Sequence, residues 1–265
     1  MTPSLEQATT SPEKDPLYIE AVARALRVLE AFSDSPEPQT LSQLAKAAGI
    51  DKSAAQRMAH TLGKLGYLEQ SSGGLVPGRR LLERSFDYLR TNPIVSRAIP
   101  ILTELRRNVQ ERVDLSLFDD LSMLYLIRLQ SKRDTFFAHL IGRRVPTFCT
   151  SGGRAVLAGL PEEQVLDILT RSDRRKITPR TTTEIDEILV HIATVHDHGY
   201  SLAIEQLQIG ELAVAVAITD KQGLPIGAIH VAGSLSEWEP ENFEKRIAPL
   251  VVAAARDINS SGINI

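Results

Sequence analysis

The spacing of apolar residues divides the chain into a helical first third and a mixed remainder. Apolar residues recur every three or four positions over Tyr18–Phe32, and again in two shorter stretches on either side of Gly49. This spacing predicts amphipathic helices. A strand over Tyr67–Gln70, a Ser- and Gly-rich turn, and a returning strand at Leu75-Val76 are expected to follow.

The two short helices carry recognisable start and stop signals. Thr40 and Gln43 match a capping box at the start of the first helix. Gly49 lacks the Cβ atom that penalises a positive φ, so the chain can leave the helix there, and Asp51 can cap the second helix. Helix, turn, helix and hairpin in this order predict a winged helix-turn-helix, which docks on DNA. A helical hairpin with a solvated basic face has the same spacing and is the alternative.

The second helix of this pair has two chemically distinct faces. The apolar face is expected to point inward and consists of Ala55, Met58, Ala59, Leu62 and Leu65. The opposite face is rich in hydrogen-bond donors, contains no carboxylate, and consists of Lys52, Ser53, Gln56, Arg57, His60 and Lys64. Because Arg can bond guanine and Gln can bond adenine with two hydrogen bonds each, this face is suited to reading the major groove.

The remainder of the chain alternates between runs of strands and groups of helices. Helices are expected over Arg79–Arg90, Val95–Glu111, Arg154–Leu160, Pro161–Leu169, Glu184–His198 and Glu241–Ile258. Strands are expected over Val113–Phe118, Met123–Leu129, Thr135–Leu140, Tyr200–Glu205, Leu212–Thr219 and Pro225–Ala232, with an irregular segment over Gly142–Cys149. This grouping predicts an α+β domain with an antiparallel sheet.

These patterns predict four segments. Residues 1–16 are polar and proline-rich and are expected to form a disordered tail. Residues 17–78 are expected to form the winged helix-turn-helix, residues 79–94 a connector helix, and residues 95–260 a second domain.

Composition narrows the classes of protein to which the chain can belong. Its 265 residues, of which 43% are hydrophobic, are enough for one large domain or two ordinary ones. The net charge of −3 excludes a globally basic nucleic-acid protein, but Leu17–Thr91 has a slight excess of Lys and Arg, consistent with a focused DNA-binding patch. The single cysteine, Cys149, excludes an intramolecular disulfide and fits a reducing cytoplasm. No apolar run approaches the roughly 18 residues of a membrane span, and no signal core begins the chain.

The sequence gives weaker support for a metal site or a catalytic site. His191, His196 and His198 resemble a metal cluster, but their spacing favours a helix end enriched in histidine. Cys149 could be a nucleophile, although a structural role is more common. Without a nucleophile–base pair, a metal set or a phosphate-binding glycine loop, we expect neither catalysis nor a cofactor. The alternatives are an enzyme acting on a small molecule with a fused helical module, and a helical dimerisation module with no DNA role.

Several blocks, taken in order, resemble the IclR family of bacterial transcription regulators, over Tyr18–Ile258. The blocks are ARALRVLEAF from Ala23, LSQLAKAAGIDKSAAQRM, GYLEQ, VPTFCTSGGRAVLAGLPEE, and HGYSLAIEQLQIGELAVAVAITDKQG. The resemblance implies a winged helix-turn-helix joined to a GAF-like or PAS-like domain that binds a small metabolite. It also implies double-stranded operator DNA as a partner, and a homodimer or a dimer of dimers.

The resemblance also carries the family's functional positions onto this chain. The DNA-reading helix falls on Lys52, Ser53, Ala54, Gln56 and Arg57. The effector pocket opens beside the loop Cys149–Gly153, where the N–H groups of Ser151 and Gly152 are expected to hold a carboxylate. The pocket's polar positions fall on Ala203, Ala213, His230 and Ala232. Because three of these are alanine, a bulkier organic acid, such as an aromatic one, is expected in place of a very small keto acid.

Overall fold

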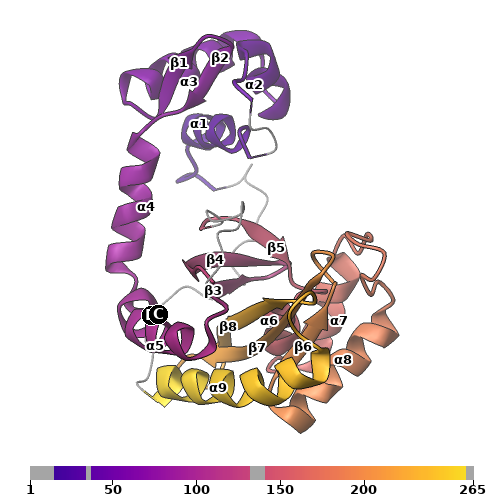
Figure 1. Cartoon of the computed structure of the whole chain (residues 1–265). Coiled ribbons are helices and arrows are strands. Elements are labelled where there is room, and N and C mark those ends of the chain that lie inside the picture. Colours follow the sequence, from indigo (N-terminus) through magenta and orange to yellow (C-terminus); the bar gives the residue numbers. More distant parts are fainter. Residues whose placement is uncertain (1–14, 34–36, 132–140, 261–265) are drawn as a thin grey trace. The chain divides into compact units, whose positions relative to one another are not determined.

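The computed structural model describes residues 15–33, 37–131 and 141–260. The chain forms two compact units, of which the first ends at Thr91 and the second begins at Asn92 (Figure 1). The strand predicted over Thr135–Leu140 and nearly all of the predicted N-terminal tail lie outside the described residues.

The first unit is the predicted winged helix-turn-helix. Its elements are α1 (Glu20–Glu30), α2 (Leu41–Ala47), α3 (Lys52–Lys64), β1 (Leu68–Ser71) and β2 (Gly74–Pro77). They are followed by α4 (Arg80–Thr91), the connector helix, with which the unit ends. Thr40 and Gln43 form the capping box of α2, and the Asp51 carboxylate accepts the Ala54 N–H at 2.8 Å to cap α3. The core that holds α1, α2, α3 and β1 together consists of Val28, Leu44, Ala48, Ala59, Leu62 and Leu68.

The second unit is built on one antiparallel sheet, as predicted. Its helices are α5 (Pro93–Val109), α6 (Ser151–Leu157), α7 (Glu162–Arg171), α8 (Ile185–His198) and α9 (Pro240–Ser260). Its strands are β3 (Arg112–Asp119), β4 (Ser122–Leu129), β5 (Arg144–Pro146), β6 (Ser201–Ile204), β7 (Glu211–Thr219) and β8 (Pro225–Ser234). The strand order is β5-β4-β3-β8-β7-β6, and every neighbouring pair is antiparallel.

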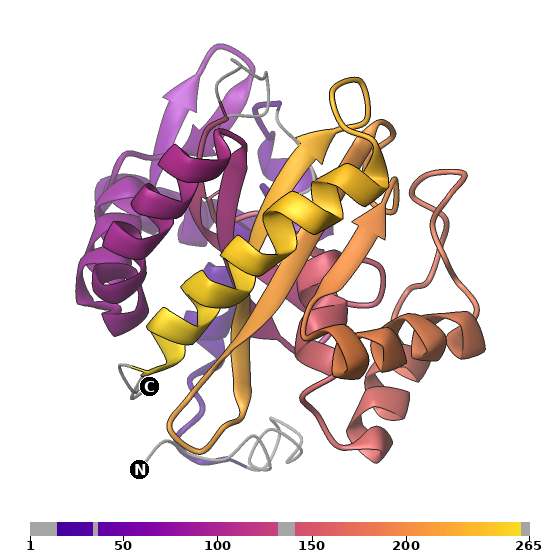
Figure 2. The ribbon, with the colours of Figure 1, turned by 60° about the horizontal axis from the view of Figure 1, so that its bottom comes forward.

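The two faces of this sheet are covered by different helices. A Cβ atom at Gly233 of β8 would meet Phe243 of α9, whereas His230 of the same strand lies against Gly152 of α6. Because side chains alternate along a strand, residues 230 and 232 face α6, and residues 231 and 233 face α9. Figure 2 shows α9 running across the sheet, and α5 packs beside α9 on β3 and β4.

Four local expectations were wrong. The segment Gly142–Cys149 contains the short strand β5, which pairs with β4, instead of being irregular throughout. Helix α6 begins at Ser151 and not at Arg154, because the Thr150 hydroxyl accepts the Gly153 N–H and caps it. Leu65 is 55% exposed, because it lies just past the last turn of α3 and not on its inward face. The second wing strand is longer than expected: it runs through Pro77, which lies opposite Leu68.

Candidate DNA-binding surface and effector site

Helix α3 presents the predicted polar face to solvent. Lys52, Ser53, Gln56, Arg57, His60 and Lys64 are all exposed. Arginines of α1 and α4 are neutralised by nearby carboxylates, for example Arg24 by Glu20 at 2.9 Å and Arg84 by Asp87 at 2.9 Å. Within the described part of the chain, no such pair involves the Lys and Arg side chains of α3. These cations are therefore available to an external polyanion.

Ala54, also predicted as a DNA-binding residue, does not belong to this exposed face. It is only 3% exposed and packs inward, and its N–H is donated to the Asp51 cap. Ala54 and Ala55 both face the core. The apolar face of a helix is wide enough to include two adjacent residues, which lie about 100° apart around the helix axis.

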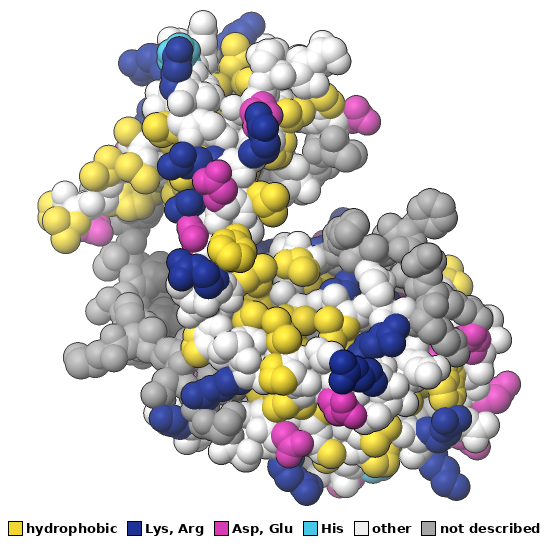
Figure 3. All heavy atoms as spheres, turned by 60° about the vertical axis from the view of Figure 1, so that its left-hand side comes forward, with side chains coloured by type: hydrophobic (Ala, Val, Ile, Leu, Met, Phe, Trp, Pro, Cys, Tyr) yellow, Lys and Arg dark blue, Asp and Glu magenta, His cyan; other side chains and the backbone are white. Residues whose placement is uncertain are grey.

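A groove of about 610 Å³ lies between α3 and the wing hairpin. Its lining includes Gln56, His60 and Lys64 from α3, and Gln70 and Gly74 from the hairpin. In the winged-helix unit, at the top of Figure 3, Lys and Arg side chains gather beside a histidine. Helix and wing thus offer donors on two sides of one groove.

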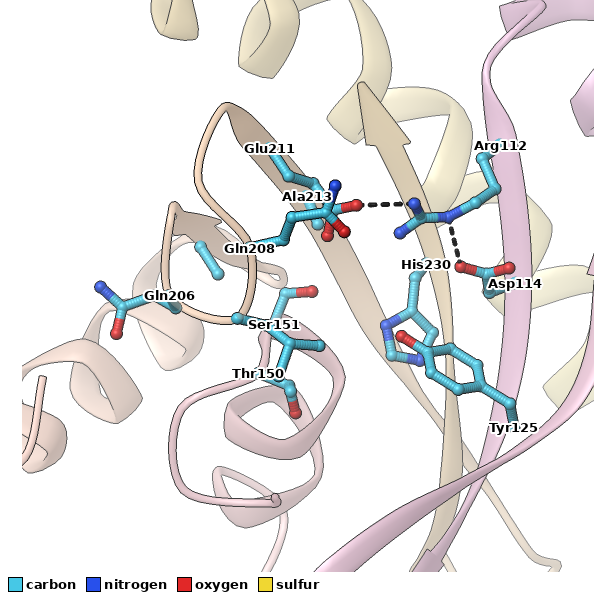
Figure 4. Close-up of a pocket in the computed structure, with 12 residues that line it drawn as sticks. Arg112, Asp114, Tyr125, Thr150, Ser151, Gln206, Gln208, Glu211, Ala213 and His230 are labelled. Carbon is cyan, nitrogen blue, oxygen red and sulfur yellow. Dashed lines mark hydrogen bonds and ion pairs between the residues drawn. The ribbon is translucent and has the colours of Figure 1, made fainter. Parts of the chain in front are cut away.

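The second unit contains a small polar cavity on the α6 face of the sheet (Figure 4). Its volume is about 30 Å³, which is room for about two water molecules. It is lined by Arg112, Asp114, Tyr125, Thr150, Ser151, Ala203, Gln206, Leu207, Gln208, Glu211, Ala213 and His230.

Arg112 is held between two carboxylates at this cavity. Its Nε atom lies 2.8 Å from Asp114 Oδ2, and its Nη1 atom lies 2.6 Å from Glu211 Oε2. Burial lowers the pKa of Arg112, but the charges of Asp114 and Glu211 more than offset this, and the pKa is raised. The Arg112 guanidinium is therefore charged at neutral pH.

A second guanidinium, that of Arg128, shares Asp114 with Arg112. Its side chain is only 3% exposed, and its Nε atom lies 3.7 Å from Asp114 Oδ1. Its Nε and Nη1 atoms are buried and have no hydrogen-bond partner among the described residues, and its guanidinium carbon lies 5.5 Å from the centre of the Tyr125 ring. Burial lowers the pKa of Arg128, with Asp114 opposing the shift.

His230 and Tyr125 contribute neutral polar groups to the same cavity. The His230 Nε2 atom lies 2.6 Å from the Ser116 hydroxyl oxygen. Burial, reinforced by Arg112, lowers the pKa of His230 to about 3, so the ring is uncharged at neutral pH. Burial raises the pKa of Tyr125 to about 12, so its hydroxyl remains protonated.

The structure brings together only some of the residues predicted for the effector site. Ser151, Ala203, Ala213 and His230 line the cavity. Gly152 lies directly behind the histidine, because a Cβ atom there would be 2.0 Å from His230 Cε1.

Cys149 and Ala232 lie outside the cavity lining. Cys149 is buried in an apolar cluster with Phe148 and Leu157, and burial raises the pKa of its thiol to about 12. A thiol with this pKa is not a nucleophile at neutral pH. Ala232 lines a neighbouring groove of about 260 Å³. The room expected from three alanines is therefore divided between two spaces.

Sequence reasoning missed the charged residues of the site, although β3 carried a signal. Asp114 and Ser116 alternate with Val113 and Leu115, and all four are buried. Polar side chains at every second position of a strand that is buried on both faces indicate a polar cavity. Glu211 had no comparable local signal, because it lies 99 positions from Arg112 in the sequence.

The histidine cluster of α8 does not form a metal site in the described ranges, where no group of three or more His, Cys, Asp or Glu side chains could hold an ion. His191 and His198 instead line a separate surface pocket with the buried Arg154. Among the described helices, none has the length and apolar character required to cross a membrane.

Two family models cover most of the chain. Residues 86–260 match the C-terminal domain of the bacterial transcriptional regulator IclR, and residues 21–72 match the IclR helix-turn-helix domain.

Curated relatives align along nearly their whole lengths. The Pca regulon regulatory protein of Pseudomonas putida is 28% identical over 247 residues, which are 92% of this chain and 84% of that protein. The p-hydroxybenzoate hydroxylase transcriptional activator of Acinetobacter baylyi is 26% identical over 248 residues, which are 92% of each chain.

Solved structures share the fold. An IclR family regulator from Brucella abortus superposes with a TM-score of 0.81 and 28% identity, covering 94% of this chain and 95% of that one. An IclR homologue from Microbacterium hydrocarbonoxydans, complexed with 4-hydroxybenzoate, superposes with a TM-score of 0.75 and 24% identity, covering 91% and 98%. The two family models match a DNA-binding helix-turn-helix followed by an effector-binding domain, along almost the whole chain. This protein therefore belongs to the IclR family of transcriptional regulators, which are not enzymes.

Proposed function

We propose that this regulator responds to a small aromatic acid bound at the cavity beside Arg112 and His230, and that it controls a catabolic operon. The observation that carries the proposal is a pair of guanidiniums that share Asp114: the partly buried Arg112, and the buried Arg128, which lies over the Tyr125 ring. Buried guanidiniums bind carboxylates strongly and directionally, and an aromatic wall suits an aromatic ligand.

Relatives support this choice of ligand class. Two are named for the Pca regulon and for activation of p-hydroxybenzoate hydroxylase, and a third holds 4-hydroxybenzoate in its crystal structure. For this chain, 4-hydroxybenzoate is therefore the first probe to try.

The ligand's carboxylate has two candidate anchors on this chain. One is the guanidinium pair; the other is the pair of N–H groups of Ser151 and Gly152 at the start of α6, near Cys149. The guanidiniums are the stronger anchor, because each carries a full positive charge and can bond a carboxylate with two parallel hydrogen bonds, whereas the N–H groups carry only partial charges. His230, Ala203 and Ala213 would contact the body of the ligand, and Ala232 its outer edge.

In the complex with DNA, Gln56 and Arg57 would contact base edges. The phosphate backbone of the DNA would be contacted by Lys52, Ser53 and His60. We propose a homodimer, or a dimer of dimers, as the form that binds the operator, because one helix offers few base contacts and symmetric half-sites supply the rest.

Thermal unfolding of the full chain tests the ligand class. Trp238 is the only tryptophan and lies in the second unit, so its fluorescence reports that unit alone. A ligand that binds only the native state adds about 2.7 kcal/mol of stability at a concentration of 100 times its Kd. We expect 4-hydroxybenzoate to raise the midpoint and its uncharged analogue, 4-hydroxybenzamide, to raise it much less.

Gel shifts with the DNA upstream of the protein's own gene then connect the ligand to function. An aromatic acid that raises the midpoint should change operator affinity, and the affinity should fall steeply with salt. A screen in which no aromatic acid stabilises the second unit would refute the proposed ligand class.

A further inference from the structure

The ion pair of Arg112 and Glu211 lies at the boundary between the small polar cavity and a neighbouring groove. A volume of about 30 Å³ cannot hold a benzene ring, so an aromatic acid must displace something. Beyond this pair lies the groove of about 260 Å³ that contains Ala232. Arg112, Gln208 and Glu211 line both spaces, and therefore form the partition between the inner cavity and the outer groove.

The two carboxylates that neutralise Arg112 differ in their freedom to move. The Asp114 side chain is 1% exposed and lies between both guanidiniums, in the middle of the sheet. The Glu211 side chain is 16% exposed and begins β7, next to Gly210, whose φ is +78°. Among the described residues, Glu211 forms an ion pair with one cation, Arg112, so turning its side chain toward solvent breaks one ion pair and leaves those of Asp114 in place.

The charges of this cluster favour an exchange of anions. The formal charges of Arg112 and Arg128 are balanced by those of Asp114 and Glu211, so this four-residue cluster is neutral. Adding a carboxylate to this set would leave a buried excess of negative charge, which is strongly unfavourable. If Glu211 turns outward, one positive charge remains, and a ligand with one carboxylate restores neutrality.

We infer that Glu211 is an internal competitor for the effector: its carboxylate occupies the position on Arg112 that the effector's carboxylate takes, and the acid binds by displacing it. This rests on the proposed function and adds a mechanism to it. Displacement opens the partition, so the inner cavity and the outer groove become one pocket. It also frees Glu211 at the start of β7, which gives the two states a structural difference that a ligand can bias.

The test is the affinity of Glu211→Gln for 4-hydroxybenzoate, measured by titration calorimetry on the full chain. Glutamine has nearly the same shape but no charge, so it competes less well for Arg112. We expect the variant to bind the acid roughly tenfold more tightly than the wild type, a typical size for such coupling. Its affinity for 4-hydroxybenzamide should remain within about twofold of the wild type.

Two further variants separate competition from general effects. Glu187→Gln removes the same charge from an exposed position on α8 and should leave both affinities unchanged. Glu211→Ala removes the competitor completely and should also bind the acid more tightly. Trp238 fluorescence verifies that each variant is folded.

The outcomes distinguish this inference from the proposed function. If the wild type binds the acid and both Glu211 variants bind it equally well or more weakly, Glu211 supports the site and competition is refuted, while the proposed ligand class stands. Binding by the Glu211 variants alone would support competition. If neither the wild type nor the variants bind an aromatic acid, the proposed function and this inference both fail.

Discussion

At the scale of single residues, the polar face of α3 depends on Arg57. It is exposed, and in the described part of the chain it pairs with no carboxylate. Arg57→Ala should cost about 1–3 kcal/mol of operator binding and relax base preference at one position of each half-site, because a bidentate contact to guanine is lost. Gel shifts with the operator and single-base variants of it measure both effects.

Lys52→Ala is the matched comparison for a phosphate contact. It should weaken binding to all DNA sequences alike. The slope of log K against log salt concentration should become shallower by about one unit. If Arg57→Ala binds the operator as tightly as the wild type does, the assignment of α3 as the base-reading helix is wrong.

His230 should make the stability of the second unit depend on pH. Its pKa falls from an ordinary 6.5 to about 3 on folding, so the unfolded chain takes up a proton below pH 6.5 that the folded chain does not. The contribution of the uncharged His230 ring to the free energy of unfolding is therefore fully present above pH 6.5. It is lost as the pH falls toward 3, at no more than about 1.4 kcal/mol per pH unit. Urea unfolding followed by Trp238 fluorescence at pH 7.5, 6 and 5 measures this loss.

His230→Gln is the control for this pH dependence. Glutamine can still bond the Ser116 hydroxyl but does not titrate, so the variant should be less stable at pH 7.5 and lose less stability on acidification. An equally steep loss in the variant would assign the effect to other groups.

At the scale of secondary-structure elements, the start of α3 depends on its cap. The Asp51 carboxylate accepts the Ala54 N–H, which holds down the pKa of Asp51. Asp51→Ala should destabilise α3 by about 1 kcal/mol, whereas Asp51→Asn should cost much less, because asparagine caps almost equally well. Hydrogen exchange of the α3 amides should accelerate in the alanine variant and change little in the asparagine variant. Equal exchange in both would show that the cap is unimportant.

Elements differed in how well the sequence predicted them. The capping box at Thr40 and the Asp51 cap were correct, because a cap is a contact between residues three positions apart. The start of α6 at Ser151 was not predicted, because Ser151-Gly152-Gly153 has the composition of a turn, whereas the Thr150 cap and close packing hold these residues in the helix. Strand β5 was missed because three residues are too few to show an alternating pattern. Its central residue, Val145, pairs with Met123, which lies 22 positions earlier in the sequence.

At the scale of the whole molecule, assembly determines how DNA is read. We expect a homodimer at micromolar concentration, binding a pseudo-palindromic site whose half-sites lie about one helical turn apart or a multiple of it. Light scattering measures the mass, and footprinting measures the spacing. A monomer that binds DNA one to one would contradict the prediction.

The sequence by itself determined the features that depend on short-range spacing. Helical periodicity placed Gln56 and Arg57 on the exposed face of α3, and the apolar strands around Leu212–Thr219 predicted an antiparallel sheet. Only the tertiary structure decided the effector cavity. Arg112 and Glu211 meet because β3 and β7 both pair with β8, and Gly152 meets His230 because α6 packs on that strand. An ion pair between residues distant in the sequence leaves no periodic trace, because neither partner needs a particular neighbour along the chain. It needs only a partner on a nearby strand of the sheet, here with β8 between them.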